Sequence, residues 1–279
     1  MPDTIVSHRR GYRVLPVQVP ASWAWRIFTL FWLVVWIATP ISFWTVGERF
    51  TPLLTTLGVL AQAVATSAGL AMIWPARRII TTMLIVVGLT WLVEWVGSTT
   101  GVPFGRYRYS SVLQPQVAGV PLLIPLAWWM MLGPAWAVAT SILTPLYLLL
   151  GRWYGPLAAL LSGAAFTAWD FYLDPQMVRL GLWTWDSPGG YFGIPWVNFI
   201  GWWLVASAIS LLVQPHLPTD DTQRSTAPRT ALLIIYTLTW MFQAVGLGLF
   251  WRQPGPALVG FIMMGLFAVA AWLQEYRRA

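Results

Sequence analysis

The chain has 279 residues, of which 58% are hydrophobic and 9% are charged, and its mean hydropathy is +0.65. This composition lies well outside that of soluble domains, so the sequence indicates an integral membrane protein. All sixteen basic residues are arginines that stand singly or in pairs between apolar runs, which fits membrane orientation and argues against nucleic-acid binding despite the net charge of +7. The sequence has no cysteine, which excludes disulfides, thiolate metal sites and cysteine nucleophiles.

Residues 1–20 contain three arginines and three prolines and are predicted to form a polar leader. The apolar run behind them is long, rich in tryptophan and without a small-residue cleavage site, so we interpret it as a retained membrane span and not as a signal peptide. We expect residues 21–279 to form a single transmembrane helical domain. Apolar runs long enough to cross about 30 Å of hydrocarbon lie at residues 22–46, 53–74, 79–97, 119–150, 154–171, 194–213, 230–250 and 256–274.

These runs predict an all-α polytopic membrane helix bundle of about eight transmembrane helices, provided that residues 119–150 cross the membrane once. The arginines test that condition, because they favour the cytoplasmic side. With a cytoplasmic N-terminus and one crossing, the eleven arginines inside are Arg9, Arg10, Arg13, Arg26, Arg77, Arg78, Arg152, Arg224, Arg229, Arg277 and Arg278. The five outside are Arg49, Arg106, Arg108, Arg179 and Arg252. Two crossings would place eight on each side, so we predict one crossing and cytoplasmic N- and C-termini.

The predicted topology brings two carboxylate-bearing helix ends to one side of the membrane. The third span ends near Glu94, and the fifth ends near Asp170 and Asp174. The loops that follow both spans lie on that side as well, whereas residues 214–229 are predicted to be a solvated polar linker on the other side. We therefore expect the two helix ends and their loops to form the walls of one shared site.

Four of the nine acidic residues are candidates for chemistry. Those set aside lie in tails, in the linker or in a short loop beside Arg49: Asp3, Asp220, Asp221, Glu275 and Glu48. Those that remain lie at or near membrane depth on one predicted face: Glu94, Asp170, Asp174 and Asp186. An ionisable group inside a span is costly and usually marks a pathway or a site. The structural alternative for Glu94 or Asp170 is an ion pair with Arg106, Arg108 or Arg179.

A second informative stretch, residues 169–203, combines acidic and aromatic side chains. Asp170 and Asp174 are spaced i, i+4 and share a helix face. This spacing is also typical of magnesium–diphosphate sites, but those need a second acidic cluster that the sequence does not show, so no metal is predicted. Trp183 and Trp185 would point the same way in an extended segment, which fits either a lid over an apolar cavity or interfacial anchoring. Asn198 is placed to bind water or to cap a helix.

The chemistry that remains is acid–base catalysis by carboxylates beside aromatic rings. His8 and His216 fall in the leader and the linker, and the sequence has no G-x-S-x-G elbow, phosphate loop or G-x-G-x-x-G motif, so no cofactor is predicted. Protonation of an alkene fits this set of residues. Apolar burial favours a protonated carboxylic acid, aromatic faces stabilise a carbocation, and a second carboxylate orients and deprotonates water.

Five blocks of the sequence, in order, resemble the CruF-type carotenoid hydratases, a family that includes γ-carotene 1'-hydroxylases of bacteria and bisanhydrobacterioruberin hydratases of haloarchaea. The blocks are Glu94 with 101–110, 119–128, 170–175, 181–185 and 191–203. The similarity covers about residues 80–215. The resemblance implies cofactor-independent addition of water to the terminal C1=C2 double bond of an acyclic carotene end, such as that of lycopene, γ-carotene or a C50 precursor, which gives a tertiary alcohol.

We predict that Glu94, Asp170 and Asp174 are catalytic, with Glu94 or Asp170 as the acid and the other positioning water. The predicted substrate-binding residues are Arg106, Tyr107, Trp169, Trp183, Trp185, Trp196 and Asn198. Arg106 and Tyr107 are expected to orient Glu94 from a glycine-rich loop that folds back over the helix ends.

The expected partners are a carotene and membrane lipid, with no nucleic acid, and the expected location is the inner cell membrane. Two other functions fit the same residues. A lycopene-cyclase-like enzyme would use the same acid but exclude water and quench the cation by ring closure. A non-enzymatic carotenoid-binding or transport protein would use the carboxylates as a proton relay.

Overall fold

The computed structural model describes residues 22–214 and 226–278 of the chain. In these ranges it contains long helices at the positions of the eight apolar runs, which confirms the predicted all-α class. They are α1 (Trp23–Val46), α2 (Thr51–Leu70), α3 (Ala76–Thr100), α4 (Leu123–Leu143), α6 (Tyr154–Arg179), α7 (Trp196–Val213), α8 (Thr226–Val245) and α9 (Pro254–Arg278). The predicted leader and residues 215–225 of the predicted linker lie outside the described residues. Residues 226–229 belong to α8, so the linker ends earlier than predicted.

Six stretches of the described residues are long and apolar enough to cross a membrane: Trp23–Leu70, Ala76–Thr100, Leu123–Arg179, Trp196–Val213, Pro228–Phe250 and Pro254–Arg278. Two of these stretches contain a pair of long helices. The short helix η1 (Gly47–Phe50) separates α1 from α2, and η2 (Thr144–Leu146), α5 (Tyr147–Leu150) and η3 (Gly151–Trp153) separate α4 from α6. The chain is thus an all-α polytopic membrane bundle, and its number of crossings stays a prediction.

Residues 119–150 contain one long helix and not two. Pro134 lies inside α4 without ending it. Before α4, the strands β2 (Gln116–Val117) and β3 (Val120–Pro121) form a short hairpin. After the turn through α5, helix α6 packs closely against α7, since a Cβ added to Gly163 would lie 2.7 Å from the main-chain oxygen of Trp203. Small residues at such positions let helix backbones approach one another.

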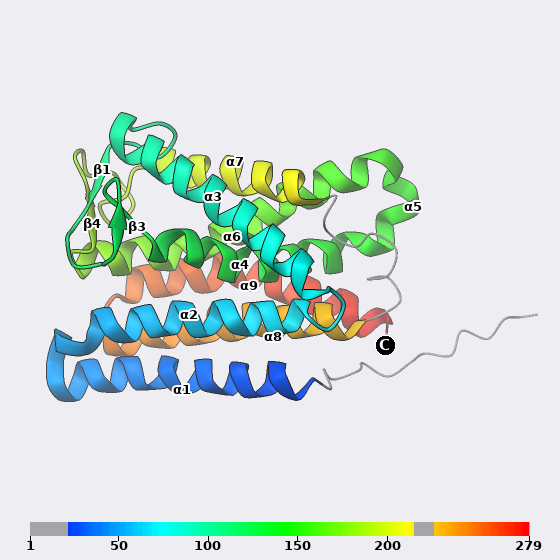
Figure 1. Ribbon diagram of the computed structural model, residues 1–279, viewed down its shortest axis with the longest axis horizontal. Coiled ribbons are helices and arrows are strands. Elements are labelled where there is room, and N and C mark those ends of the chain that lie inside the picture. Colours follow the sequence, from blue (N-terminus) through cyan, green and yellow to red (C-terminus); the bar gives the residue numbers. More distant parts are fainter. Residues whose placement is uncertain (1–21, 215–225, 279) are drawn as a thin grey trace, which may run out of the picture.

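The long helices run roughly along the longest axis of the molecule, and the connecting segments gather at its two ends (Figure 1). One end, here called the strand end, carries β1 (Tyr107–Tyr109), the β2–β3 hairpin and β4 (Trp183–Trp185). The opposite end, here called the α5 end, carries α5 and the C-terminal part of α9. Because β1 follows α3 and β4 follows α6, the ends of α3 and α6 meet at the strand end, as the topology predicted.

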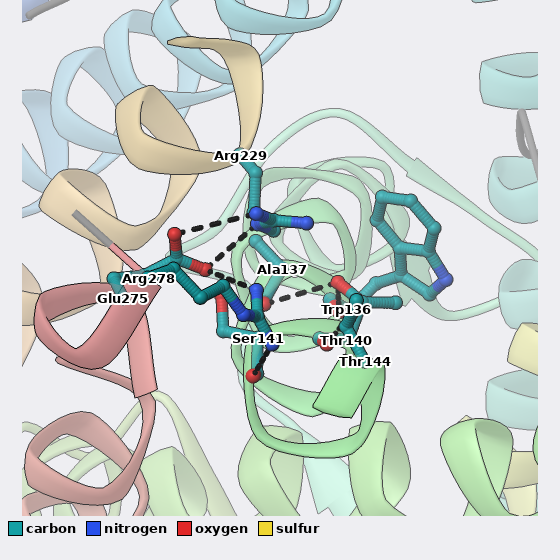
Figure 2. Close-up of polar contacts among 8 residues, drawn as sticks. All are labelled: Trp136, Ala137, Thr140, Ser141, Thr144, Arg229, Glu275 and Arg278. Atoms are coloured by element: carbon teal, nitrogen blue, oxygen red, sulfur yellow. Dashed lines mark hydrogen bonds and ion pairs between the residues drawn. The ribbon is translucent and has the colours of Figure 1, made fainter. Parts of the chain in front are cut away.

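A buried ion cluster joins three helices at the α5 end (Figure 2). Glu275 of α9 forms an ion pair with Arg229 of α8, with 2.8 Å between the Arg229 Nε and the Glu275 Oε1. Arg278 forms a second ion pair with the same oxygen at 3.1 Å. Arg278 also donates to the main-chain oxygen of Ser141 in α4 at 2.7 Å. The assignment of Glu275 to a tail was wrong, because α9 extends to Arg278 and leaves Glu275 only 4% exposed.

Candidate functional site

The glycine-rich loop after α3 folds back over the helix ends. Gly101 ends α3 with a φ of +86°, in the left-handed region that favours glycine. Phe104 then lies fully buried between α3 and α7. A Cβ added to Gly97 of α3 would lie 2.6 Å from the Phe104 ring, and one added to Gly201 of α7 would lie 2.9 Å from it. These two glycines therefore provide the space that anchors the loop, and the chain enters β1 over the end of α3.

Strands β1 and β4 pair antiparallel and cover the strand end. Tyr107 lies opposite Trp185, and Tyr109 lies opposite Trp183. Trp183 and Trp185 are buried on one face of β4 while the residue between them is exposed, so the two indoles point the same way, as predicted. The Trp185 Nε1 donates to the main-chain oxygen of Phe104 at 3.0 Å, which ties the ribbon to the anchored loop.

Glu94, in the last turns of α3, is 2% exposed and accepts three hydrogen bonds, all from neutral side chains. The Tyr107 hydroxyl donates to Oε2 at 2.5 Å and the Tyr109 hydroxyl donates to the same oxygen at 2.7 Å. The Trp128 Nε1, from the first turns of α4, donates to Oε1 at 3.1 Å. Tyr107 was predicted to reach Glu94, whereas Tyr109 and Trp128 were missed.

The two tyrosine donors lie outside the membrane-spanning stretches. Burial raises the pKa of both Tyr107 and Tyr109 well above the usual value of 10.0, and the neighbouring Glu94 carboxyl raises each further. Both phenols therefore remain protonated donors to Glu94 across the physiological pH range.

Asp170 and Asp174 lie on one face of α6 and share a single partner from α7. The amide nitrogen of Asn198 donates to Asp170 Oδ2 at 2.9 Å and to Asp174 Oδ2 at 2.6 Å. The Trp183 Nε1 of β4 donates to Asp174 Oδ1 at 3.0 Å. Asp170 Oδ1 is buried without a hydrogen-bond partner among the described residues. Asn198 thus joins the two carboxyl groups, instead of capping the start of α7.

No arginine forms an ion pair with Glu94, Asp170 or Asp174 among the described residues. Arg106 is exposed and makes no hydrogen bond with Glu94 in these ranges, because it precedes the inward-facing Tyr107. Asp186 pairs with Arg108 at 3.0 Å on the outer face of the ribbon. The buried carboxyl groups are therefore held only by neutral donors.

Trp196 lies away from these carboxyl groups. It is 56% exposed and packs against the rings of Tyr191 and Phe199, with centroid separations of 5.6 and 5.7 Å. The structure therefore does not bring Trp196, a predicted substrate-binding residue, together with the other candidate residues.

An aromatic cavity of about 60 Å³ lies beneath the β1–β4 ribbon. Its walls include Glu94, Asp174 and Asn198 together with Tyr107, Tyr109, Trp128, Trp169, Trp183, Trp185 and Trp202. Asp170 does not line it, so Asp174 and Glu94 are the carboxyl groups that face the space. We call this space the carboxyl cavity.

A larger apolar chamber of about 290 Å³ adjoins the carboxyl cavity. The two spaces share the wall residues Thr55, Val59, Met130, Trp169, Leu173 and Met177, here called the neck. The chamber continues between α1, α2, α6 and α8 toward η5 (Gly246–Phe250). Its wall includes Ile37 and Ile41 of α1, which are 46% and 49% exposed on the apolar surface of the bundle.

The described residues contain no group of three or more His, Asp or Glu side chains arranged to hold a metal ion. The i, i+4 spacing of Asp170 and Asp174 instead directs both carboxyl groups to the amide of Asn198.

Comparison with known proteins identifies the family. Residues 50–267, which are 218 of the 279 residues, match the family described as carotenoid biosynthesis protein. A stretch of 122 residues is 34% identical to the bisanhydrobacterioruberin hydratase of Haloarcula japonica and covers 43% of this chain and 39% of that relative. The match thus spans less than two thirds of the curated relative. No solved structure matches the chain significantly. The family resemblance read from the sequence is confirmed, and the chain belongs to the carotenoid biosynthesis protein family.

Proposed function

We propose that the protein is a carotenoid hydratase that adds water across the terminal C1=C2 double bond of an acyclic carotene. One observation carries the proposal: Glu94 and Asp174 face the same small aromatic cavity with no arginine counter-ion in the described residues. An apolar space with two acidic groups suits an alkene that must first be protonated and then meet water. The hydratase named among the relatives supports the same reaction class.

We propose Asp174 as the acid and Glu94 as the group that positions water. Asp170 and Asp174 share one amide, and two carboxyl groups so close are costly to ionise together, so the pair is expected to hold a proton. Glu94 accepts three hydrogen bonds, which favour its carboxylate form. Asp170 does not line the cavity, and we assign it as a positioning residue that supports Asp174.

The reaction then balances without a cofactor. The Asp174 proton forms a new C–H bond at C2, and the π electrons leave a tertiary cation at C1. The faces of Trp128, Trp169 and Trp202 stabilise this cation, because aromatic rings carry negative charge on their faces. Water attacks C1, and Glu94 takes the proton that water loses. Proton return from Glu94 to Asp174 restores the starting state.

We propose that the apolar chamber takes part of the polyene next to the end group. The chamber and the carboxyl cavity share the neck residues as a common wall, and the exposed Ile37 and Ile41 provide an apolar edge through which a long polyene would reach lipid. We propose that the end group enters the carboxyl cavity while the polyene passes through the chamber.

Expression in a host that accumulates lycopene tests the proposal. The intact chain should give a pigment heavier by one water, and Glu94→Gln or Asp174→Asn should abolish it. Asp186→Asn is the matched control, because this carboxyl group lies outside the cavity in an exposed ion pair. A new product of unchanged mass would indicate cyclisation, and no new product would indicate pigment binding or transport. Either result would overturn the hydratase assignment.

We further propose an inner-membrane location with the α5 end facing the cytoplasm. Because the chain has no native cysteine, single cysteines at Ser111 and Leu149, both exposed, can be labelled individually. A membrane-impermeant reagent added to intact cells should label Ser111→Cys at the strand end and not Leu149→Cys at the α5 end. The reverse pattern would contradict this orientation.

A further inference from the structure

Four glutamines are buried at the wall of the apolar chamber and in the neighbouring turn. Gln62 of α2 is fully buried, Gln176 of α6 and Gln243 of α8 are each 7% exposed, and Gln253 is 9% exposed. Gln62, Gln176 and Gln243 line the chamber itself. A buried amide without sufficient hydrogen bonds is unfavourable, so the three amides at the chamber wall and the fourth in the neighbouring turn need a further polar partner beside them.

The hydrogen bonds of these amides within the described residues are incomplete. Gln243 donates to Gln176 at 3.4 Å, and Gln62 donates to the Met131 sulfur at 3.1 Å and to Thr239 at 3.4 Å. The acceptor oxygens of Gln62 and Gln253 have no partner in the described part of the chain. The Nε1 donor of Trp251, another wall residue of the chamber, has none either. The chamber is large enough for water, and water supplies both a donor and an acceptor.

The glutamines also mark a path from the strand end. Gln253 lies in the turn between η5 and α9 and donates to the main-chain oxygen of Pro175 at 3.1 Å. Gln176 follows Pro175 directly in the chain, and its side-chain oxygen accepts the hydrogen bond from Gln243. Thr55 supplies the only side-chain hydroxyl among the neck residues. In contrast, the β1–β4 ribbon covers the carboxyl cavity at this end with buried indoles.

We infer that the Gln253–Gln176–Gln243–Gln62 series holds and delivers the water that attacks the carotenoid cation. This inference rests on the proposed hydratase function and names the source of its nucleophile. The water oxygen forms the new C–O bond at C1, and its surplus proton passes to Glu94, so no further reactant is needed. The amides stay neutral throughout and act only through hydrogen bonds.

Removing the amides should separate protonation from hydration. We would prepare Gln62→Met, Gln176→Met and Gln243→Met, because methionine keeps the length of glutamine without its hydrogen bonds. Gln214→Met is the matched control, since Gln214 is partly buried next to Gly155 and lines neither space. Gln243→Asn keeps an amide and should lie between wild type and Gln243→Met.

The readout uses membranes of the lycopene-producing host suspended in D₂O. In D₂O the acid delivers deuterium to the carotene. A cation that then loses a proton before water attacks becomes a deuterium-labelled carotene again, whereas a cation captured by water appears as hydrated product. The ratio of labelled carotene to hydrated product should rise about fivefold or more in the three methionine variants, and it should stay at the wild-type value in Gln214→Met.

An unchanged ratio in the methionine variants would overturn the inference. A parallel fall of label and hydrated product would also overturn it, because the glutamines would then hold the carotenoid and not water. If wild-type membranes yield neither label nor hydrated product, the proposed hydratase function itself fails, which distinguishes the two conclusions.

Discussion

The two ends of the bundle bury carboxyl groups in opposite ways. At the α5 end, Glu275 is paired with Arg229 and Arg278, and the cluster joins α4, α8 and α9 (Figure 2). At the strand end, Glu94 and Asp174 accept hydrogen bonds only from tyrosine, tryptophan and asparagine side chains, and both face a cavity. Charge compensation suits a structural role, whereas neutral donors around a space leave an acid free to exchange its proton. The contrast therefore separates a carboxyl group that holds helices together from those proposed to do chemistry.

The largest effect is expected from Asp174→Asn. Loss of the proposed acid should lower hydration by about 10³-fold or more, because general acid catalysis contributes on this scale. Product formation per unit of membrane-inserted protein is the measurement. Asp170→Asn should lose less activity, since Asp170 does not line the carboxyl cavity. Equal losses in the two variants would contradict the division of roles between them.

Protein stability should depend more on the carboxyl group at the α5 end than on the one at the strand end. Glu275→Gln removes the ionic partner of the buried Arg229 and of the partly buried Arg278, and should lower the free energy of unfolding by about 3–5 kcal/mol. Glu94→Gln should cost only about 1–2 kcal/mol, because the amide oxygen can still accept from the Tyr107 and Tyr109 hydroxyls that share Oε2, and only Trp128 loses its acceptor. Thermal unfolding of the detergent-purified variants measures both. A larger loss for Glu94→Gln would remove the contrast between the two ends.

Tyr109→Phe should lower hydration by about 10- to 100-fold, the value of a hydrogen bond to a charged group. The phenyl ring keeps the packing against Trp183, whose ring centroid lies 5.8 Å away. Tyr147→Phe is a suitable control, since Tyr147 lies at the α5 end. If Tyr109→Phe keeps full activity, the hydroxyl has no part in holding Glu94.

Much of the fold follows from apolar runs, but the site depended on contacts that no local pattern encodes. Trp183 and Trp185 were predicted to share a face because an extended segment alternates its side chains. The same alternation identifies Tyr109 beside Tyr107 and turns Arg106 outward. Trp128 has no such signal, because it reaches Glu94 only through the packing of α3 on α4.

The α5 end shows the same limit. Hydropathy falls at the end of the last apolar run, so Glu275 was assigned to a tail. The helix continues because Arg229, from a different helix, compensates the Glu275 charge. A local reading of the sequence contains no information about that partner.

Trp183→Phe should have a smaller effect, about fivefold on hydration, because Asp174 loses one of its two neutral donors and keeps Asn198. Trp153→Phe, at the α5 end and 58% exposed, is the control. Initial rates of product formation compare them. A loss as large as that of Asp174→Asn would instead indicate that the ribbon itself collapses.

The smallest effect concerns alkaline pH. Burial raises the pKa of Tyr107 and Tyr109 above 10.0, so the folded state binds more protons than the unfolded state above that pH. Their contribution to stability is fully present below about pH 10 and is lost as the pH rises toward the folded values. Thermal unfolding between pH 7 and 11 should therefore decline less steeply in Tyr107→Phe/Tyr109→Phe than in wild type. An equally steep decline in the variant and in wild type would contradict the raised pKa of the two tyrosines.

The position of Phe104 has a consequence for the order of synthesis. Its ring occupies the space left by Gly97 and Gly201, and Gly201 is 97 residues beyond Phe104 in the chain. The ribbon strand that pairs with β1 is also made long after it. Glu94 therefore cannot obtain its tyrosine donors in their final places until α7 has been translated and inserted. A ribosome-bound chain that ends before α7 would contain the acidic residues of the site without their assembled environment, so the chemistry becomes possible only after most of the protein is made.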